Sequence, residues 1–358
     1  MSLTIPVGNT IVEDDHSQTI SEVTTNTFVI NLQQAIFDLE VDSHQYSLIP
    51  EPAGGGNASP IKKIRHFLTG TELSTEELKR ILEKAKVLKQ TPSFYYQALA
   101  NKSLAMIFEK PSFRTRLSFA MAMQSMGGIA IESLGDTRKQ ETPADMVRVL
   151  NGYTDFIMVR THADEILQEM VAHAKVPIIN GLSALHHPCQ ILADLLSLWE
   201  HFGSLEGLTI TYVGDGNNIL HSLMLLAPQL GITINYCCPE SCQPSNGIIE
   251  QACDIRSDMI HRFAKPEMAV KNADAVYTDV WTSMGFEAVD NSQVFQRFQV
   301  NESLMSYAKS GAVFMHCMPM MRGKEVSETL PDSPASIIFT QSENRLHVQK
   351  ALLLFLNL

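Results

Sequence analysis

The chain has 358 residues, of which 45% are hydrophobic and 18% are charged, so it is long enough for two ordinary globular domains with sizeable cores. Its formal net charge of −12 argues against a nucleic acid as a partner, because phosphate backbones require basic patches. The longest apolar stretches are short and interrupted by polar residues, so we expect no membrane span.

Cysteine usage and the amino-terminal residues favour a cytoplasmic protein. The first residues lack both the basic segment of a signal peptide and the arginine-rich pattern of a transit peptide. Six unevenly spaced cysteines do not predict a disulfide scaffold. Cys237, Cys238 and Cys242 lie close together but lack paired metal-site spacing, so we interpret them as a strand end with its following loop.

Residues 1–60 are predicted to be a flexible N-terminal extension. They contain eight Asp or Glu and no Lys or Arg, so the net charge of −12 leaves only −4 for the rest of the chain. A locally positive pocket is therefore easily accommodated there. The segment PEPAGGGNASP (50–60) has the composition of a flexible linker.

Alternating strand and helix patterns begin near Ile61. The first helix opens with the capping-box residues Ser74 and Glu77 and repeats apolar residues at helical spacing. Three strand patterns, at 103–109, 128–134 and 155–160, alternate with helix patterns at 114–128 and 143–153. After a helix over 188–202, the pattern resumes with strands at 208–214, 234–239, 274–280, 312–318 and 336–341, a helix at 218–231 and a last helix at 343–358.

This order predicts an α/β fold of two doubly wound parallel-sheet domains joined by helices, with the active site in the interdomain cleft. We expect the domains to span residues 61–200 and 201–340. Residues 341–358 are expected to form a C-terminal helix that packs back on the first domain.

The segment KPSFRTR (110–116) predicts an anion site. It joins a strand end to a helix that begins at about Ser112, where free backbone N–H groups and the positive end of the helix dipole gather. Thr115 adds a hydroxyl, and Arg114 and Arg116 add forked positive charge. The alternative, a solvated basic first turn, is weaker because arginines at a helix N-terminus oppose the dipole.

Three other segments supply polar groups at strand ends or helix starts. In HHPCQ, His187 and Gln190 can face one cleft from a helix N-terminus, although a structural histidine is an alternative. Arg160 ends a predicted strand, where either a functional group or a surface salt bridge can stand. In VGDGNN, Ile219 replaces the third glycine of a dinucleotide fingerprint, which argues against a nicotinamide site; Asn217 and Asn218 can instead hold a polar substrate.

Two further strands end in reactive side chains. Asp279 can meet an ammonium group in the cleft or can simply cap its loop. Cys317 is either a buried inert cysteine or, paired with His316, the thiol of a cysteine hydrolase. The hydrolase interpretation leaves the anion site and Asp279 unexplained.

Taken together, the chain resembles the ornithine carbamoyltransferases of the aspartate/ornithine carbamoyltransferase superfamily over about residues 63–357. The segments that carry the resemblance are SFRTR (112–116), MVRTH (158–162), HHPCQ (186–190), GDGNN (214–218), DVWTSMG (279–285), HCMP (316–319) and ENR (343–345). The SMG segment distinguishes ornithine enzymes from aspartate, putrescine and N-acetylornithine carbamoyltransferases.

The resemblance implies roles for individual residues. It implies that the phosphate of carbamoyl phosphate is bound by Ser112, Phe113 (through its backbone), Arg114, Thr115 and Arg116. The carbonyl would be polarised by Thr115, Arg160 and His187, and the amino group held by Gln190. L-Ornithine would be bound by Asn218, Asp279, Ser283 and Met284, with Cys317, the Met318 carbonyl and Arg345 at the reaction centre. The resemblance implies neither a metal nor an organic cofactor.

The resemblance further implies a homotrimer in which a loop near residues 136–142 enters the neighbouring active site. That loop is about two residues shorter here than the family pattern, so we expect Arg138 or Gln140 to replace the glutamine that the family uses there. The expected function is ornithine carbamoyltransferase activity in arginine biosynthesis. The alternatives are a carbamoyltransferase for another diamino acid or amine, and a catalytically weakened regulatory relative.

Overall fold

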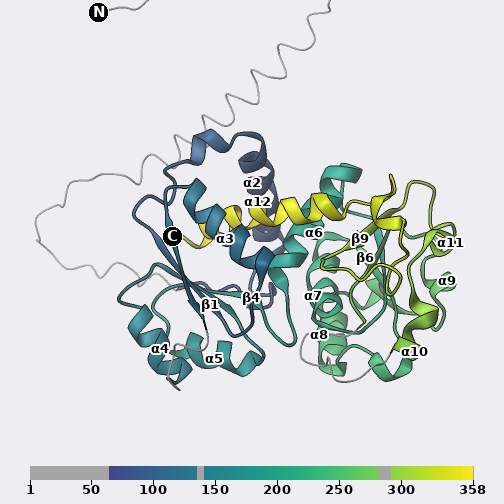
Figure 1. Cartoon of the computed structure of the whole chain (residues 1–358), viewed down its shortest axis with the longest axis horizontal. Helices are drawn as coiled ribbons and strands as arrows, with labels where there is room; N and C mark the ends of the chain where they lie inside the picture. Colours follow the sequence, from purple (N-terminus) through teal and green to yellow (C-terminus); the bar gives the residue numbers. More distant parts are fainter. Residues whose placement is uncertain (1–63, 135–140, 282–291, 358) are drawn as a thin grey trace, which may run out of the picture. The chain divides into compact units, whose positions relative to one another are not determined.

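Two parallel β-sheets organise the residues that this computed structural model describes, 64–134, 141–281 and 292–357 (Figure 1). The first sheet has the strand order β2-β1-β3-β4 and the second has the order β7-β6-β5-β8-β9. Every paired strand is parallel to its neighbour. The predicted α/β fold with two parallel sheets is confirmed, whereas the predicted extension 1–60 lies outside the described residues.

The first sheet carries helices on both faces. Its strands are β1 (Ser103–Phe108), β2 (Ile129–Leu134), β3 (Phe156–Arg160) and β4 (Ile178–Leu182), and its helices are α3 (Phe113–Ser125), α4 (Pro143–Leu150) and α5 (Asp164–His173). Alternate residues of β1 point to opposite faces. Leu104 and Met106 pack into the large core that includes α2 and α3, whereas Ile107 packs with residues of α4 and α5.

The second sheet repeats this arrangement. Its strands are β5 (Thr209–Val213), β6 (Thr233–Cys237), β7 (Ile260–Arg262), β8 (Ala275–Thr278) and β9 (Val313–His316). The helices between them are α7 (Asn218–Leu226), α8 (Asn246–Arg256), α9 (Pro266–Ala269), α10 (Ser292–Phe295) and α11 (Glu302–Met305). Short 3₁₀ turns occur at Pro92–Tyr95, Ala227–Leu230, Glu240–Cys242, Ser257–Met259, Gln296–Phe298 and Leu330–Asp332.

Three longer helices pack together beside the sheets: α2 (Thr75–Gln90), α6 (Pro188–Phe202) and α12 (Ile338–Leu356). The predicted capping box of Ser74 and Glu77 is present at the start of α2, and the apolar residues of the predicted face are buried. Helix α6 starts after His187 at Pro188, a residue suited to a first turn, and ends at Gly203 in the left-handed conformation, with φ of 78°.

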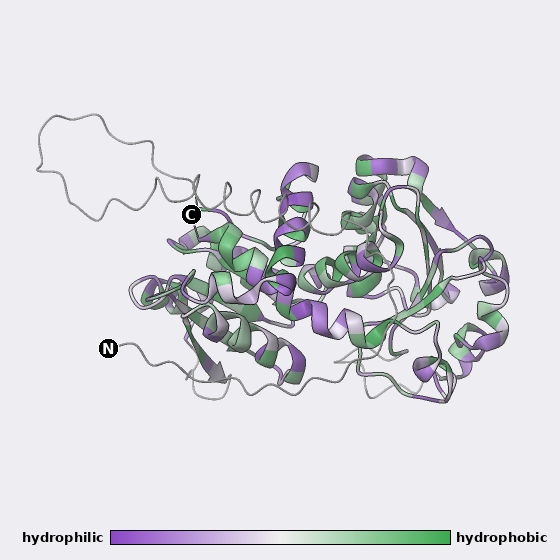
Figure 2. Ribbon diagram, turned by 90° about the horizontal axis from the view of Figure 1, so that it is seen from above, coloured by the Kyte–Doolittle hydropathy of each residue, from purple (hydrophilic) through white to green (hydrophobic). Residues whose placement is uncertain are grey.

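Helix α12 ties this layer together. It packs against α2, α3 and α6 and also contacts β9, so it is in contact with elements of both halves of the chain (Figure 1). Figure 2 shows apolar residues concentrated along the strands, with hydrophilic residues frequent on the outer helices. None of the helices within the described ranges combines the length and hydropathy that a membrane span requires.

The structure corrects one predicted element and adds seven, of which α9, α10 and α11 are helices of four residues each. The segment 336–341 is not a strand: α12 already begins at Ile338, five residues before its predicted start. A short apolar run does not distinguish a strand from a buried helical turn by periodicity alone. Helices α5 and α8 and strands β4 and β7 were absent from the predicted order; β7 has only three residues, and β4 contains Gly181 and Asn180, which weaken a strand pattern.

The turn between β5 and α7 lies so close to a neighbouring loop that it requires glycine. A β-carbon added to Gly216 would lie 2.3 Å from the Pro244 nitrogen and 2.7 Å from the Cys242 carbonyl oxygen, both backbone atoms that cannot easily move. We predict that Gly216→Ala lowers the free energy of unfolding by about 1–3 kcal/mol, as expected for overpacking. Urea denaturation measures this change.

Gly247→Ala is the matched control for this variant. Gly247 lies in α8 and its added β-carbon would meet only the Ser245 side chain, 4.0 Å away. Alanine also favours helix over glycine, so stability should stay unchanged or rise slightly. Equal destabilisation by the two variants would contradict the close approach at Gly216.

Candidate active site

A cavity of about 850 Å³ opens where the carboxyl ends of strands from both sheets gather. Its walls come from the turns after β1, β3, β4, β5, β8 and β9 and from α12. Of the residues singled out from the sequence, it is lined by Ser112, Phe113, Arg114, Arg160, His187, Gln190, Asn218, Asp279, Cys317, Met318 and Arg345. Segments more than 200 residues apart in the chain therefore meet at one site.

Two residues of the predicted phosphate segment do not line this cavity. Thr115 is fully buried, and its hydroxyl accepts a hydrogen bond from Arg345 at 2.7 Å. Arg116 is exposed and lies 3.6 Å from Glu132 of β2. Residues two apart in a helix face nearly opposite directions, so Arg114 and Arg116 cannot both point into the pocket. The structure therefore does not support the predicted phosphate contact of Arg116.

Four other predicted site residues, Arg138, Gln140, Ser283 and Met284, lie outside the described residues. They belong to segments 135–140 and 282–291, and they remain predictions.

The anion end of the pocket is built on the start of α3. Ser112 is the N-cap of this 13-residue helix, and its hydroxyl accepts from the Thr115 backbone N–H at 3.4 Å. The same hydroxyl accepts from the Arg160 guanidinium at 3.2 Å, which joins the end of β3 to the helix start. The free N–H groups of the first turn and the helix dipole favour an anion at this point.

Three guanidinium groups converge on this end. Burial and, after it, the positive charges of Arg345 and Arg114 together lower the pKa of Arg160 to about 10. Burial also lowers the pKa values of Arg114 and Arg345. The hydrogen bonds of Arg345 go to uncharged partners, the Gln190 carboxamide at 2.9 Å and the Thr115 hydroxyl. Mutually repelling cations in a buried pocket are well suited to a multiply charged anion.

His187 lies in this positive environment as a neutral imidazole. Burial lowers its pKa well below the usual value, and Arg345, Arg160 and Arg114 lower it further. Its backbone N–H donates to the Ser222 hydroxyl at 2.7 Å, and its Nδ1 atom has no hydrogen-bond partner among the described residues. A neutral imidazole held in this way can donate one hydrogen bond to a substrate oxygen without adding another charge.

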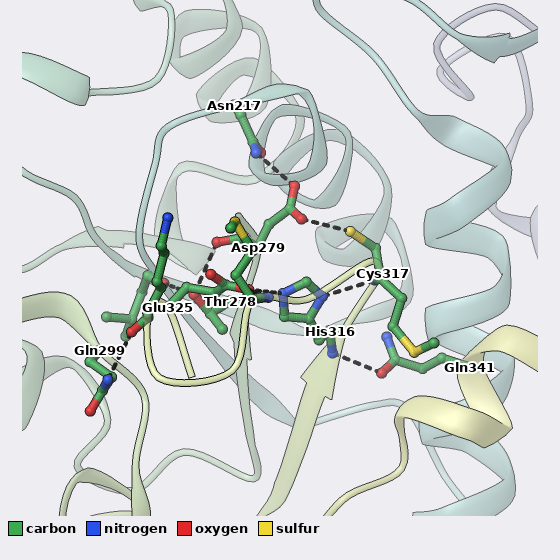
Figure 3. A network of polar contacts seen from close by, with 12 residues as sticks. Asn217, Thr278, Asp279, Gln299, His316, Cys317, Glu325 and Gln341 are labelled. Carbon is green, nitrogen blue, oxygen red and sulfur yellow. Dashed lines mark hydrogen bonds and ion pairs between the residues drawn. The ribbon is translucent and has the colours of Figure 1, made fainter. Parts of the chain in front are cut away.

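The wall of the pocket after β5, β8 and β9 presents a carboxylate, Asp279, whose hydrogen bonds are drawn in Figure 3. Asp279 follows β8 and is largely buried; one of its oxygens accepts from the Asn217 amide at 2.8 Å and the other from the Cys317 thiol at 3.0 Å. Asn218 lies beside Asn217 at the start of α7, where its amide donates to the Ser183 carbonyl at 2.9 Å. This end therefore offers a fixed negative charge next to neutral amides.

Cys317 is a hydrogen-bond donor in this arrangement. Burial raises the pKa of its thiol well above the usual value, and the Asp279 carboxylate raises it further. His316 does not activate the thiol, because its Nδ1 accepts from the Met318 backbone N–H at 2.8 Å and its Nε2 faces Glu325 at 3.3 Å. The geometry therefore argues against a cysteine hydrolase, which requires a thiolate paired with an imidazole.

The same contacts bear on metal binding. Donor atoms of Asp279, His316 and Cys317 lie within 4.8 Å of one another, a grouping that can in principle hold a metal ion. However, the thiol proton is engaged by Asp279, and both ring nitrogens of His316 already have partners. We assign no metal to these residues.

Comparisons with known proteins agree with this geometry. Residues 65–200 match the family model described as "Aspartate/ornithine carbamoyltransferase, carbamoyl-P binding domain", and residues 206–356 match the model for the Asp/Orn binding domain of the same family.

The chain belongs to the aspartate/ornithine carbamoyltransferase family.

Individual relatives agree with this assignment to the carbamoyltransferases. A curated relative from Pyrococcus furiosus, named anabolic ornithine carbamoyltransferase, is 43% identical over 299 residues, which cover 81% of this chain and 95% of the relative. The solved structure of an ornithine carbamoyltransferase from Pyrococcus furiosus superposes with a TM-score of 0.77 at 42% identity, covering 81% of this chain and 96% of that one. An acetylornithine transcarbamylase complexed with acetylcitrulline superposes with a TM-score of 0.74 at 28% identity, covering 81% and 98%.

The carbamoyltransferase pocket also depends on residues that the sequence analysis did not single out as site residues. Asp194 and Gln341 are fully buried and hydrogen-bonded behind Gln190 and His316, and Glu325 is buried against His316. Asn217, considered only as a substrate contact, orients Asp279 instead. The signal in the sequence was a polar residue at a buried position of an apolar helix, as Asp194 is in QILADLL.

His221 of α7 joins two loops of the pocket and predicts a pH dependence of stability. Its Nδ1 lies 3.1 Å from the Leu185 carbonyl, and its Nε2 accepts from the Ser245 N–H at 3.0 Å, so the ring must be neutral. Burial lowers its pKa from 6.5 to about 4. The unfolded chain binds this proton more readily, so the stabilisation is complete above about pH 6.5 and is lost as the pH falls toward 4.

We predict that His221→Asn is destabilising at pH 7 and that its difference from the wild type shrinks as the pH falls toward 5. Urea denaturation of both proteins between pH 5 and 8 measures this difference, because every other titrating group is common to the two. A pH-independent difference would show that His221 is not held neutral.

The protonated thiol of Cys317 gives a second prediction. Cys317→Ser retains a donor to Asp279, so kcat/KM should stay within about tenfold of the wild type, whereas Cys317→Ala should lose more because Asp279 loses a partner. A loss of three orders of magnitude or more in the serine variant would indicate a nucleophilic thiolate and would contradict the hydrogen-bonding role.

Proposed function

We propose that this protein transfers the carbamoyl group of carbamoyl phosphate to the δ-amine of L-ornithine, giving L-citrulline and phosphate. The observation that carries the proposal is the polarity of the pocket: three guanidinium groups and the start of α3 face one end, and the Asp279 carboxylate faces the other. An anionic carbamoyl donor and a cationic amino acid fit these two ends in one orientation only.

Carbamoyl phosphate binds at the start of α3. Arg114, the Ser112 hydroxyl and the backbone N–H groups of the first turn neutralise its phosphate. Arg160 and His187 donate to the carbonyl oxygen, and Thr115 lies behind them with its hydroxyl tied to Arg345. Gln190 accepts from the carbamoyl amino group, because its carbonyl oxygen is the end that faces the Arg345 side of the pocket.

L-Ornithine occupies the end of the pocket after β5, β8 and β9. Asp279 meets an ammonium group, and Asn218 supplies a neutral amide beside it. Ser283 and Met284 complete the recognition of the amino-acid end in this proposal. The δ-amine then lies near Cys317 and the Met318 backbone, which line the wall between the carboxylate and the arginines.

The reaction then needs little beyond positioning and charge. The lone pair of the neutral δ-amine forms the new C–N bond at the carbamoyl carbon, and negative charge grows on the carbonyl oxygen, where Arg160 and His187 donate hydrogen bonds. The C–O bond to phosphate breaks, the amine loses its proton to an acceptor in the pocket or to the departing phosphate, and Arg114 and Arg345 offset the charge of the phosphate. Holding both substrates in one pocket supplies much of the remaining acceleration.

We further propose a homotrimer with the segment near 136–142 entering the neighbouring active site, where Arg138 or Gln140 donates to the phosphate. An apolar face beside the pocket supports an interface there. On α3, Phe113, Leu117 and Met121 are exposed at a spacing of four residues, and Ile129 and Ile131 are exposed on β2, which packs against α3.

We also propose that the protein is cytoplasmic and acts in arginine biosynthesis. All six cysteines are free thiols, as expected in a reducing compartment. The biosynthetic role is supported by the relative that carries the name anabolic ornithine carbamoyltransferase.

Arg114 and Arg116 allow a matched test of the phosphate position. Arg114 lines the pocket, whereas Arg116 faces Glu132, so Arg114→Ala should lower kcat/KM by at least two orders of magnitude and Arg116→Ala should cost much less. Steady-state citrulline formation measures both variants. A larger loss from Arg116→Ala than from Arg114→Ala would move the phosphate away from the pocket described here.

The substrate is tested by offering carbamoyl phosphate with L-ornithine, putrescine, N-acetylornithine, 2,4-diaminobutyrate and aspartate in parallel. The proposal predicts strong preference for L-ornithine. Preference for another amine would keep the mechanism and replace the substrate, an alternative with a structural precedent in the similar fold of the acetylornithine enzyme. Binding of carbamoyl phosphate without turnover of any amine would indicate a regulatory relative.

A further inference from the structure

A carboxylate that does not itself line the pocket lies where α6, α12 and β8 meet. Asp194 is fully buried on α6. One of its oxygens accepts from the side-chain amides of Gln190 and Gln341, each at 2.9 Å, and the other accepts from the Tyr277 hydroxyl at 2.9 Å. Three donors from three different elements therefore converge on one acidic group.

This carboxylate and Arg345 together fix which end of the Gln190 amide faces the substrate. An ionised carboxylate only accepts hydrogen bonds, so the Gln190 atom beside it must be the nitrogen. The other end of the amide meets the Arg345 guanidinium, which only donates, so that end must be the oxygen. Gln190 consequently presents an acceptor toward the pocket, and an acceptor matches the amino group of a carbamoyl donor and not its carbonyl oxygen.

The same carboxylate reaches the other half of the site through Gln341. The nitrogen of the Gln341 amide donates to Asp194, and its oxygen accepts from the His316 backbone N–H at 3.0 Å (Figure 3). The His316 ring then accepts from the backbone N–H of Met318, a residue with a positive φ of 58°. Its other nitrogen therefore carries the proton and faces the buried Glu325. The position of the Cys317 segment is thus linked to Asp194 by three successive hydrogen bonds.

We propose that Asp194 is a positioning residue that fixes the amide orientation of Gln190 and, through Gln341 and His316, the backbone that carries Cys317. The inference rests on the proposed carbamoyl transfer. In this view one ionised carboxylate aligns the carbamoyl-binding side and the amine-binding side of the pocket at the same time.

Protonation of Asp194 should therefore weaken carbamoyl phosphate binding. A protonated carboxyl group replaces an acceptor by a donor, and one of the two glutamine amides then loses its partner. Burial raises the pKa of Asp194 to about 6, and the bonds from Gln341, Gln190 and Tyr277 oppose that rise. The titratable groups that face it are Tyr277 on β8, Arg345 on α12 and Cys317 after β9. The affinity should fall as the pH drops through about 6.

Two variants of this cluster separate positioning from folding. Tyr277→Phe removes one donor to the carboxylate without changing any residue that lines the pocket. Asp194→Asn removes the titration but can keep its carbonyl oxygen toward both glutamines while its NH₂ faces the Tyr277 hydroxyl, which can turn and accept. Ser197→Ala is the matched control: Ser197 accepts from Asn344 at 2.9 Å and so forms another buried contact between α6 and α12, one turn away from Asp194.

The measurement is the KM for carbamoyl phosphate at saturating L-ornithine between pH 5 and 8, with calorimetric binding of carbamoyl phosphate in parallel. We expect the KM of the wild type to rise several-fold below pH 6. In Tyr277→Phe this rise should move to higher pH by about one unit, because the carboxylate loses a stabilising bond. In Asp194→Asn the rise should be absent, with a KM at pH 8 within about threefold of the wild type, and Ser197→Ala should follow the wild-type curve.

Each other outcome overturns the inference. An unshifted curve in Tyr277→Phe, a retained acid limb in Asp194→Asn, or the same shift in Ser197→Ala would each show that Asp194 does not control the site. These results are distinguishable from failure of the proposed function, because in that case the wild type itself would form no citrulline at any pH.

Discussion

Mutual repulsion among Arg114, Arg160 and Arg345 is the constraint around which the site is built. Three guanidinium groups cannot be brought together in a buried pocket without a cost in desolvation and in like-charge repulsion. Burial lowers the pKa of all three, and like-charge repulsion lowers the pKa values of Arg160 and Arg345 further. Neutral groups contact two of the three: Ser112 accepts a hydrogen bond from Arg160, and Thr115 and Gln190 accept hydrogen bonds from Arg345. Neutral hydrogen-bond partners of this kind leave the charge of Arg345 available to an anionic substrate.

The neutral scaffold also explains why catalysis can rely on electrostatics. His187 stays uncharged among the arginines and Cys317 stays protonated beside Asp279, so neither is prepared to act as a charged nucleophile. What the pocket offers is a set of donors fixed in advance at the place where an oxyanion develops and a phosphate departs. The buried side-chain amides of Gln190 and Gln341, which donate to Asp194, hold α6, α12 and the end of β9 in fixed positions relative to one another.

The starts of several helices could be predicted from the sequence, because caps and first turns carry local signals. Ser74 with Glu77, Ser112 before α3 and Pro188 at the start of α6 are each set by caps or first-turn chemistry, and the pocket residues stand beside them. Arg116 shows the limit of motif-based assignment, since two residues along a helix reverse the direction of a side chain. The strand expected at 336–341 shows that a short apolar run alone does not identify its element.

Polar contacts between residues far apart in the chain could not be predicted from the sequence. Asp194 and Gln341 are 147 residues apart in the chain, yet they share a hydrogen bond, and no spacing rule connects them. In the sequence Asp194 is a polar residue between apolar neighbours, and Gln341 is one of several polar residues in the run TQSENR (340–345). Their hydrogen bond depends on how α6 and α12 pack against each other, which only the tertiary structure determines.

The cluster of buried arginines should be stabilised by a bound anion, and thermal unfolding with each substrate alone measures this stabilisation. Carbamoyl phosphate alone should raise the Tm markedly, and inorganic phosphate should raise it less, because a bound anion relieves the repulsion among the arginines. Both increases in Tm should become smaller at high salt. L-Ornithine alone should change the Tm little. A large stabilisation by L-ornithine alone, together with none by carbamoyl phosphate, would contradict the account.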